Sequence, residues 1–353
     1  MAHEKQRLIL LYDGTWNDPQ DRTNVYRLSR NIEDYDGDVC QRFFYDPGVG
    51  TSEFSQLRGG LFGTGLSKNL LEGYDWLARC YTKGDEIWIF GFSRGAFTAR
   101  SLVGMIRKCG LLHIATPDLL AEAEKLYRDK HSSPDSENCL LFRTQYSRIV
   151  NIHLIGVWDT VGALGVPGTM ISERDLYSWH DTQLSKIVER AYQAVALDEH
   201  RAAYDAVLWT AENGEKKAEQ IDVEQRWFIG AHANVGGGYG DDPLADLSLE
   251  WMQKKASAAG LKLTPYKAPS NAYKSEPRDS FKEFLKGGYS IFRKLFHSGD
   301  SRHHRYFNKN QMDDLAINAT IDPSVWARWK SVSTYRPQTL VAAGLTPPEK
   351  INQ

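Results

Sequence analysis

The sequence has little that would build a disulfide scaffold or a zinc site. Only four of its 353 residues are cysteines, and no two of them form a CxxC pair. Closely spaced cysteines are typical of structural zinc sites and of small secreted scaffolds. We therefore expect four separate thiols, and no metal or cofactor is required by any motif discussed below.

A surplus of charge of one sign is also lacking. The 43 Lys and Arg residues are balanced by 45 Asp and Glu residues, which gives a formal net charge of −2. Nucleic-acid binders need an excess of basic side chains to neutralise phosphates. We therefore expect no nucleic-acid partner, and the composition says nothing about the oligomeric state.

Long hydrophobic runs are absent. No apolar stretch approaches the roughly 18 residues that a membrane-spanning helix needs. The first apolar run is short and ends at Asp13, unlike a secretory signal. The sequence thus predicts a cytoplasmic protein, and export by a route without a cleaved signal stays open.

Short apolar runs that end abruptly in Gly, Asp or Ser alternate with helical patterns. Such runs are typical of strands buried on both faces of a parallel sheet. We predict an α/β fold with a mostly parallel sheet and helices on both faces, as one domain over 1–353 with cap or lid insertions at 161–189 and 262–312. The expected strands lie in 7–15, 42–50, 86–93, 149–160, 191–199 and 225–238, and the clearest helices in 69–81, 95–110, 117–130 and 244–260.

One serine stands where a strand is expected to give way to a helix. Ser93 lies between Gly91 and Gly95 in GFSRG, which fits the pattern G-x-S-x-G. In this pattern the serine occupies a strained turn, where side chains two residues away would collide with backbone. We predict a nucleophile elbow with Ser93 at its tip, and expect the Arg94 N–H to help form an oxyanion hole. The alternative is a plain glycine turn with a solvated serine.

A serine hydroxyl needs a neighbouring base, and α/β-hydrolases place the acid and then the histidine after the serine. Among the downstream histidines, His232 follows the apolar run WFIGA and opens the glycine-rich HANVGGGYGDD. We predict His232 as the base, the alternative being a structural histidine at a strand end. By contrast, HSGDSRHHRYF (297–307) is typical of a solvated loop, although its histidines could bind a metal.

Three carboxylates end apolar runs and are candidates for the acid that orients the histidine. Asp159 ends IHLIGVWD, Asp198 ends AVALD, and Asp13 ends the first run but precedes the serine in the chain. We favour Asp159 and keep Asp198 as the alternative acid. Gly14 and Thr15 follow Asp13, and their backbone N–H groups could complete the oxyanion hole, although a plain Asp-Gly turn explains them equally well.

Taken together, the ordered blocks resemble the DUF2235 family, which includes the catalytic domain of Tle1-type phospholipase effectors of type VI secretion. The resemblance runs from residue 7 to about 340. It implies an α/β-hydrolase fold and a triad of Ser93, Asp159 and His232. One block departs from the usual GxHSDVGGGY, because Ala233 and Asn234 occupy its fourth and fifth positions. The blocks are LYDGTWND, TNVYRL, YDPGVGT, GFSRGAFTARSLVGMI, GVWDTVGALGVP, ALDEHR, WFIGAHANVGGGY and LADLSLEWM.

The stretch 281–296, FKEFLKGGYSIFRKLF, mixes aromatic and aliphatic residues with four basic ones. Such a segment is typical of a peripheral membrane contact, although a helix packed on the core gives the same pattern. We therefore expect a serine hydrolase that cleaves carboxylic esters through an acyl-enzyme, with a lipid or other ester as substrate and a lipase or phospholipase as the favoured type. The alternatives are an esterase or thioesterase for small soluble esters, and a degenerate hydrolase that serves as a binding module.

Overall fold

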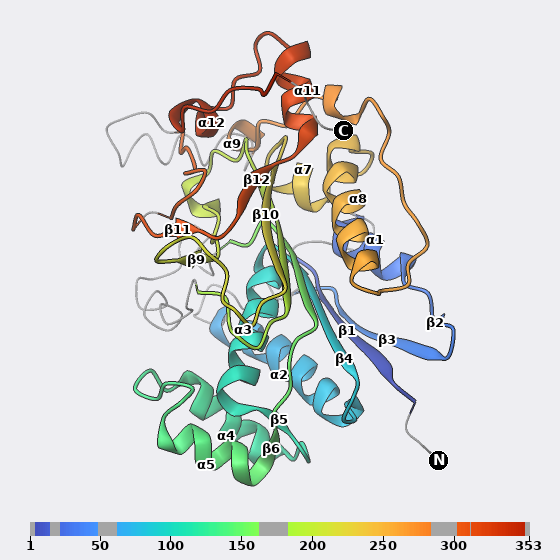
Figure 1. The fold of residues 1–353 in the computed structure, drawn as a ribbon, viewed down its shortest axis with the longest axis vertical. Coiled ribbons are helices and arrows are strands. Elements are labelled where there is room, and N and C mark those ends of the chain that lie inside the picture. Colours follow the sequence, from blue (N-terminus) through green and yellow to red (C-terminus); the bar gives the residue numbers. More distant parts are fainter. Residues whose placement is uncertain are drawn as a thin grey trace.

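The computed structural model describes residues 4–14, 22–48, 62–161, 183–283, 302–310 and 312–349. An eight-stranded sheet runs through its centre in the order β12-β10-β8-β7-β4-β1-β3-β2 (Figure 1). Each neighbouring pair is parallel except β2 and β3. The strands are β1 (Gln6–Tyr12), β2 (Tyr35–Asp36), β3 (Val39–Asp46), β4 (Glu86–Phe92), β7 (Leu154–Trp158), β8 (Arg190–Ala196), β10 (Asp222–Phe228) and β12 (Ala319–Ile321).

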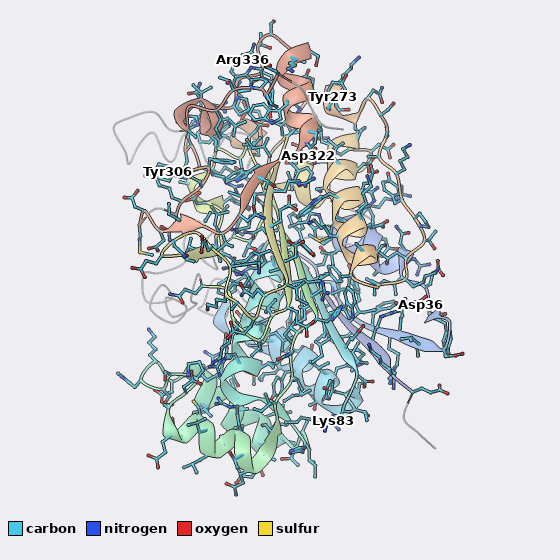
Figure 2. All side chains as sticks on the ribbon, in the orientation of Figure 1. Asp36, Lys83, Tyr273, Tyr306, Asp322 and Arg336 are labelled. Atoms are coloured by element: carbon cyan, nitrogen blue, oxygen red, sulfur yellow. The ribbon has the colours of Figure 1, made fainter. Side chains whose placement is uncertain are left out.

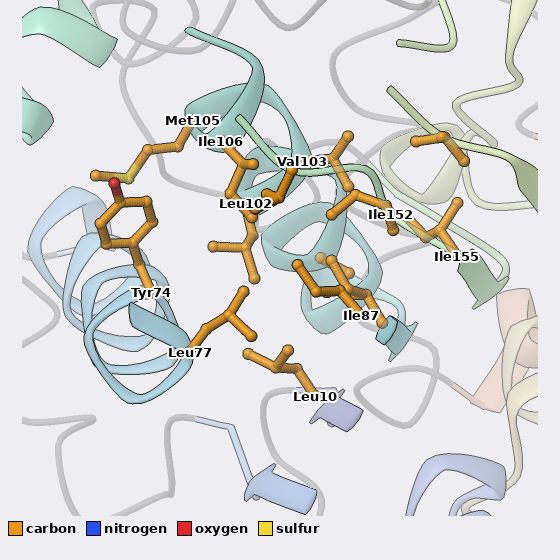
Figure 3. Close-up of a cluster of buried hydrophobic side chains, with 14 of the residues drawn as sticks. Leu10, Tyr74, Leu77, Ile87, Leu102, Val103, Met105, Ile106, Ile152 and Ile155 are labelled. Carbon is orange, nitrogen blue, oxygen red and sulfur yellow. The ribbon is translucent and has the colours of Figure 1, made fainter. Parts of the chain in front are cut away.

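Helices cover both faces of this sheet. Because successive side chains of a strand point to opposite faces, β1 contributes to two separate clusters: Leu8 and Leu10 to one, Ile9 and Leu11 to the other. The first cluster packs against α2 (Phe62–Cys80), α3 (Arg94–Cys109) and α4 (Pro117–Arg128), and Figure 3 shows its α3 side chains among those of the sheet. The second packs against α1 (Asn24–Asn31) and α8 (Pro243–Ala258). The strands are therefore buried on both sides, as their uninterrupted apolar runs predicted.

Smaller elements complete the described part of the chain. A third cluster joins the end of the sheet around Trp227 to α11 (Pro323–Ser331) and α12 (Gln338–Ala342). The remaining elements are β5 (Leu111–Leu112), β6 (Ser147–Arg148), β9 (Thr210–Ala211), β11 (Leu315–Ala316), α5 (Glu137–Tyr146), α7 (His232–Gly236), α9 (Ser280–Glu283), η4 (Ala202–Tyr204) and η5 (Ala272–Lys274). In the ranges that the structure describes, no helix is both long and apolar enough to cross a membrane.

The predicted α/β class with a mostly parallel sheet and helices on both faces is confirmed. The predicted cap at 161–189 falls largely on 162–182, which lie outside the described residues. The second predicted insertion, 262–312, is described at both ends, and in its first part, 262–283, the side chains of Leu263, Ala272 and Phe281 are buried. The middle of that insertion, 284–301, lies outside the described residues.

Candidate active site

Ser93 occupies the turn between β4 and α3. Its backbone has φ 58° and ψ −120°, a left-handed conformation that a residue with a side chain rarely adopts. The turn is held from the neighbouring strand, because the Ser93 N–H donates to the Trp158 carbonyl at 3.0 Å. Strain of this kind persists only where the surrounding structure imposes it, and it is concentrated at functional sites.

Glycine is required on both sides of this serine. A methyl group on Gly91 would lie 2.6 Å from the Gly95 carbonyl oxygen, and one on Gly95 would lie 2.2 Å from the Tyr12 carbonyl oxygen. Carbon and oxygen atoms that are not bonded do not approach so closely. The end of β1 therefore packs directly against the first turn of α3, which explains the spacing that the sequence pattern carries.

His232 lies against the serine. It begins α7 directly after the loop that follows β10, and its Nε2 lies 2.8 Å from the Ser93 Oγ. Its ring packs between Phe92, with centroids 4.7 Å apart, and Tyr204, with centroids 5.1 Å apart. Burial, the largest effect, lowers the pKa of His232, and the hydrogen bond to Asp159 only partly offsets it. At neutral pH the imidazole is therefore neutral and can accept a proton at Nε2.

The other nitrogen of the imidazole lies against Asp159. Its Nδ1 is 2.6 Å from the Asp159 Oδ2, and Asp159 is completely buried at the end of β7. The Ala196 N–H donates to the Asp159 Oδ1 at 2.9 Å. Ser93, His232 and Asp159, which are far apart in the sequence, thus form one hydrogen-bonded chain at the carboxyl edge of the parallel strands.

Arg305 is a residue of this site that sequence reasoning missed. Its Nη1 donates to the Asp159 Oδ1 at 2.7 Å and its Nη2 to the Asp159 Oδ2 at 3.0 Å, and both side chains are almost fully buried. Burial alone would raise the pKa of Asp159, but Arg305 and His232 together hold it well below its usual value. Asp159 is therefore ionised at neutral pH and remains so in moderately acidic solution.

The position of Arg305 corrects the interpretation of 297–307 as a solvated loop. Arg305 is only 3% exposed, and it also donates to the Ala196 carbonyl at 2.8 Å and to the Tyr204 carbonyl. Its neighbour Tyr306 is exposed at the edge of the molecule (Figure 2). The segment leading to Arg305 lies against the body because His303 is 3.1 Å from the Asp205 carboxylate. His297 lies outside the described residues.

Asp198, the alternative acid, contacts other groups. Its Oδ2 accepts from the Gly230 N–H at 2.7 Å and from the Tyr335 hydroxyl at 3.0 Å. Its own N–H donates to the Gly230 carbonyl at 3.0 Å. These bonds fix the loop before His232, whereas no bond joins the Asp198 carboxylate to the imidazole. Burial raises the pKa of Asp198.

Of the three predicted oxyanion-hole residues, the structure describes Arg94 and Gly14. Arg94 is the first residue of α3, where N–H groups point out of the helix. The Gly14 N–H donates to the Asp13 Oδ1 at 2.7 Å, and the Asp13 Oδ2 accepts from Thr23 and from Tyr45. Asp13 thus holds the loop after β1. Thr15 lies outside the described residues, and the oxyanion hole stays a prediction.

A second buried ion pair, Glu199 with Arg201, accepts a hydrogen bond from the backbone of His232. Glu199 accepts from the Arg201 guanidinium at 2.8 Å through both carboxylate oxygens. One of these oxygens also accepts from the His232 N–H at 3.3 Å. The Arg201 guanidinium stacks on the Tyr204 ring at 3.6 Å, and that ring meets the imidazole edge-on. Sequence reasoning missed this pair too, although Glu199 and Arg201 lie in the quoted block ALDEHR.

Asn234, where the block departs from the usual pattern, holds the loop around His232 together. Its Oδ1 accepts from the Ala231 N–H at 3.0 Å and from the Arg278 N–H at 3.1 Å. Its Nδ2 donates to the Asp242 Oδ2 at 2.8 Å. An amide is needed here, because a carboxylate could not donate to Asp242.

Within the described ranges, no group of three or more His, Cys, Asp or Glu residues could hold a metal ion.

Residues 6–255 match the family described as "T6SS, Phospholipase effector Tle1-like, catalytic domain". The chain belongs to this family. The match to the Tle1-like catalytic domain includes Ser93, Asp159 and His232 and ends before Arg305.

Several individual proteins are similar to this Tle1-like chain. The uncharacterized Saccharomyces cerevisiae protein YEL023C is 30% identical over 233 residues, which cover 58% of this chain and 33% of the yeast protein. A solved structure of an uncharacterized Pseudomonas aeruginosa protein has a TM-score of 0.44 at 18% identity, covering 84% of this chain and 52% of that one. The structure of the Tle1 effector bound to the VgrG spike has a TM-score of 0.40 at 16% identity, covering 68% and 53%. The chain therefore spans about a third of the yeast protein and about half of each of these structures.

Proposed function

We propose that the protein is a serine hydrolase that cleaves carboxylic esters of lipids, with Ser93 as nucleophile, His232 as general base and acid, and Asp159 as the carboxylate that orients the imidazole. The observation that carries this proposal is the hydrogen-bonded chain of 2.8 Å and 2.6 Å that joins the three side chains. Proximity alone would be a weak argument, but the strained backbone of Ser93 and the burial of Asp159 are costly features that the proposed role explains.

The chemistry follows from the geometry. The His232 Nε2 takes the Ser93 hydroxyl proton while the Oγ attacks the ester carbonyl carbon. The carbonyl oxygen then carries negative charge, which the Arg94 N–H and the loop after β1 would stabilise. As the tetrahedral intermediate collapses, His232 protonates the departing alcohol oxygen and an acyl-enzyme remains on Ser93. Water, deprotonated by His232, then releases the carboxylic acid.

Asp159 and Arg305 determine the net charge beside the His232 imidazole. In a chain of serine, histidine and carboxylate, the carboxylate fixes the tautomer and stabilises the imidazolium that forms during the reaction. Here the carboxylate is itself bound by a guanidinium, so the pair is neutral before reaction. The imidazole is therefore neutral at lower pH than it would be beside an unpaired carboxylate.

A lipid substrate is favoured over a small soluble ester because the family is described as the catalytic domain of a phospholipase effector. The predicted membrane contact at 281–296 does not add to this argument. Phe281 is buried under the Arg302 guanidinium, and residues 284–296 lie outside the described ranges. Single-domain organisation and cytoplasmic location stay predictions.

The test is hydrolysis of phospholipid vesicles and of short p-nitrophenyl esters by the wild type and by Ser93→Ala. We expect release of fatty acid from the vesicles by the wild type, and a loss of about 10⁴-fold or more in the variant. Activity on short esters alone would favour the small-ester enzyme, and no activity on either would favour a binding module.

The two candidate acids can be separated in the same assay. Asp159→Asn should lower kcat by about 10⁴-fold, because the neutral amide favours the wrong imidazole tautomer. Asp198→Asn keeps the hydrogen bond from the Gly230 N–H and should retain most activity. The reverse result would transfer the role of the acid to Asp198.

A further inference from the structure

A cavity of about 470 Å³ lies beside α3, away from the catalytic residues. Its wall on α3 is formed by Phe97, Ser101, Gly104 and Lys108, and its opposite wall includes Trp209. Ser93, His232 and Asp159 do not line it. At 1.5 Å rise per residue, Ser101 lies about 12 Å and Lys108 about 22 Å along the helix from Ser93. A group bound between them is therefore too far from the Ser93 hydroxyl to be the scissile ester.

Two residues that line this cavity carry buried hydroxyls without hydrogen-bond partners. Ser101 is 3% exposed, and its hydroxyl has no hydrogen-bond partner among the described residues. The same holds for the Ser185 hydroxyl on the opposite wall. Buried hydroxyls are almost always hydrogen-bonded, because leaving them unpaired costs free energy. Rotation of either side chain about its Cα–Cβ bond would be needed to bring the hydroxyl to a ligand that accepts hydrogen bonds.

A buried ammonium group adds positive charge. Lys108 is 6% exposed, and its Nζ donates to two backbone carbonyls, Tyr127 O at 3.3 Å and Asp129 O at 2.5 Å. The Asp129 carboxylate lies near enough to favour the charged form, although no carboxylate oxygen among the described residues is hydrogen-bonded to the ammonium. Burial lowers the pKa of Lys108, so the ammonium form would gain from an anion bound nearby.

Among the described residues that line the cavity, basic side chains outnumber acidic ones. Six basic residues line the cavity against two acidic ones, Asp129 and Asp135. Of the six, Arg107 is paired with Asp135 at 2.7 Å, whereas Lys217 donates to the Leu184 backbone carbonyl at 2.7 Å. The basic residues are Arg100, Arg107, Lys108, Lys130, Lys186 and Lys217.

The remaining lining is apolar. Phe97, Ile155, Val188 and Trp209 contribute side chains that are almost fully buried. Gly104 has no side chain, so the helix leaves room at its middle, and a methyl group there would lie no closer than 3.4 Å to Tyr127. The volume lies within the range of about 300–1,000 Å³ that is typical of small-molecule sites. The cavity thus suits a ligand with one anionic end and one apolar end.

We propose that this cavity is a binding site for a small amphiphilic anion, in which a phosphate or carboxylate headgroup binds between Ser101 and Lys108 and an apolar chain lies on Phe97 and Val188. The site is distinct from the ester-cleaving site and does not depend on its chemistry. Because one wall is α3, which begins at Ser93, the bound anion contacts the helix that carries the proposed nucleophile.

The test is calorimetric titration of the Ser93→Ala protein with octyl phosphate, octanoate, octanol and inorganic phosphate. The Ser93→Ala background prevents turnover, so that binding is measured whether or not the protein is a hydrolase. We expect octyl phosphate or octanoate to bind at least ten-fold more tightly than octanol. Tighter binding of octyl phosphate identifies a phosphate headgroup, tighter binding of octanoate identifies a carboxylate, and competition by inorganic phosphate shows that phosphate alone occupies the polar end.

Two variants locate the site. Lys108→Met removes the buried charge, and Ser101→Leu fills the polar end with carbon, so each should weaken octyl phosphate binding at least ten-fold. Lys125→Met, which removes one exposed positive charge from α4 outside the cavity, should leave affinity within two-fold. Thermal melts confirm that each variant is folded. Equal binding of octanol and octyl phosphate, equal affinity in all variants, or no binding at millimolar concentration would overturn the proposal.

Discussion

Replacement of Arg305 by Met should shift the pH dependence of activity. The Arg305 Nη2 and the His232 Nδ1 both bond to the Asp159 Oδ2, at 3.0 and 2.6 Å, so they lie within 5.6 Å of each other. At an effective dielectric constant of about 20, unit charges at this distance interact by about 3 kcal/mol, or about two pKa units. Without the guanidinium, the pKa of His232 should therefore rise by up to about two units.

The assay is kcat/KM as a function of pH on a soluble ester. The acidic limb reports the pKa of the base in the free enzyme, so we expect it to move up by up to about two units in Arg305→Met. Activity near pH 6 should fall by up to about 100-fold and recover at alkaline pH. Arg305→Lys keeps the charge and should show a smaller shift.

Stability should change with pH in a defined direction. In the wild type the pKa of Asp159 is depressed, so its contribution is present above the unfolded pKa and lost only as pH falls through the folded one. Without Arg305, only His232 still opposes the effect of burial, so the carboxyl pKa should be less depressed and its contribution to stability smaller. We expect Arg305→Met to lose about 3–5 kcal/mol at neutral pH, and less below pH 4.

The matched control is Arg328→Met. Arg328 is also a buried arginine, but it donates to the Tyr273 and Ser275 carbonyls and to Glu276. Its loss should destabilise the protein without moving the acidic limb. If the folded Arg305→Met protein keeps the wild-type limb, or if Arg328→Met moves it equally, the reasoning about the Arg305 charge is refuted.

Three further substitutions test other contacts. Gly95→Ala places a methyl group 2.2 Å from the Tyr12 carbonyl oxygen, so we expect a lower melting temperature and a large loss of activity. A variant with wild-type stability and activity would show that the backbone at this turn can move to accept the methyl group. Asn234→Asp puts a second carboxylate where the amide donates to Asp242 at 2.8 Å, so urea titration should show a loss of about 1–3 kcal/mol at neutral pH that shrinks in acid. Burial raises the pKa of Asp46 to about 6, so ionisation of this carboxyl lowers the free energy of unfolding as pH rises through 6. Asp46→Asn should therefore raise the free energy of unfolding at pH 8 but hardly change it at pH 4.

The sheet and the strained turn at Ser93 were predictable because their signals are local. β7 is a continuous apolar run, as are β1 and β4 after their first polar residues, and the turn at Ser93 needs glycine two residues to either side. The identity of the acid was not predictable in the same way. Asp159 and Asp198 both follow strands, and only their positions in the folded sheet place one against the imidazole and the other against Gly230 and Tyr335.

Arg305 could not be found from the sequence. It lies 146 residues from Asp159 in the chain, within a polar segment whose composition is that of a solvated loop. Nothing local distinguishes its guanidinium from that of Arg302, which binds the partly exposed Asp279. Only the path of the chain after α9 brings Arg305 to the buried carboxylate.

The central claim is that His232 makes the Ser93 oxygen nucleophilic. Intact-mass and peptide mass spectrometry after treatment with a fluorophosphonate measures this directly. We predict one covalent adduct, mapped to Ser93, that forms at least about 100-fold more slowly in His232→Ala. An unmodified wild-type protein, an adduct on another residue, or an equal rate in folded His232→Ala would contradict the account.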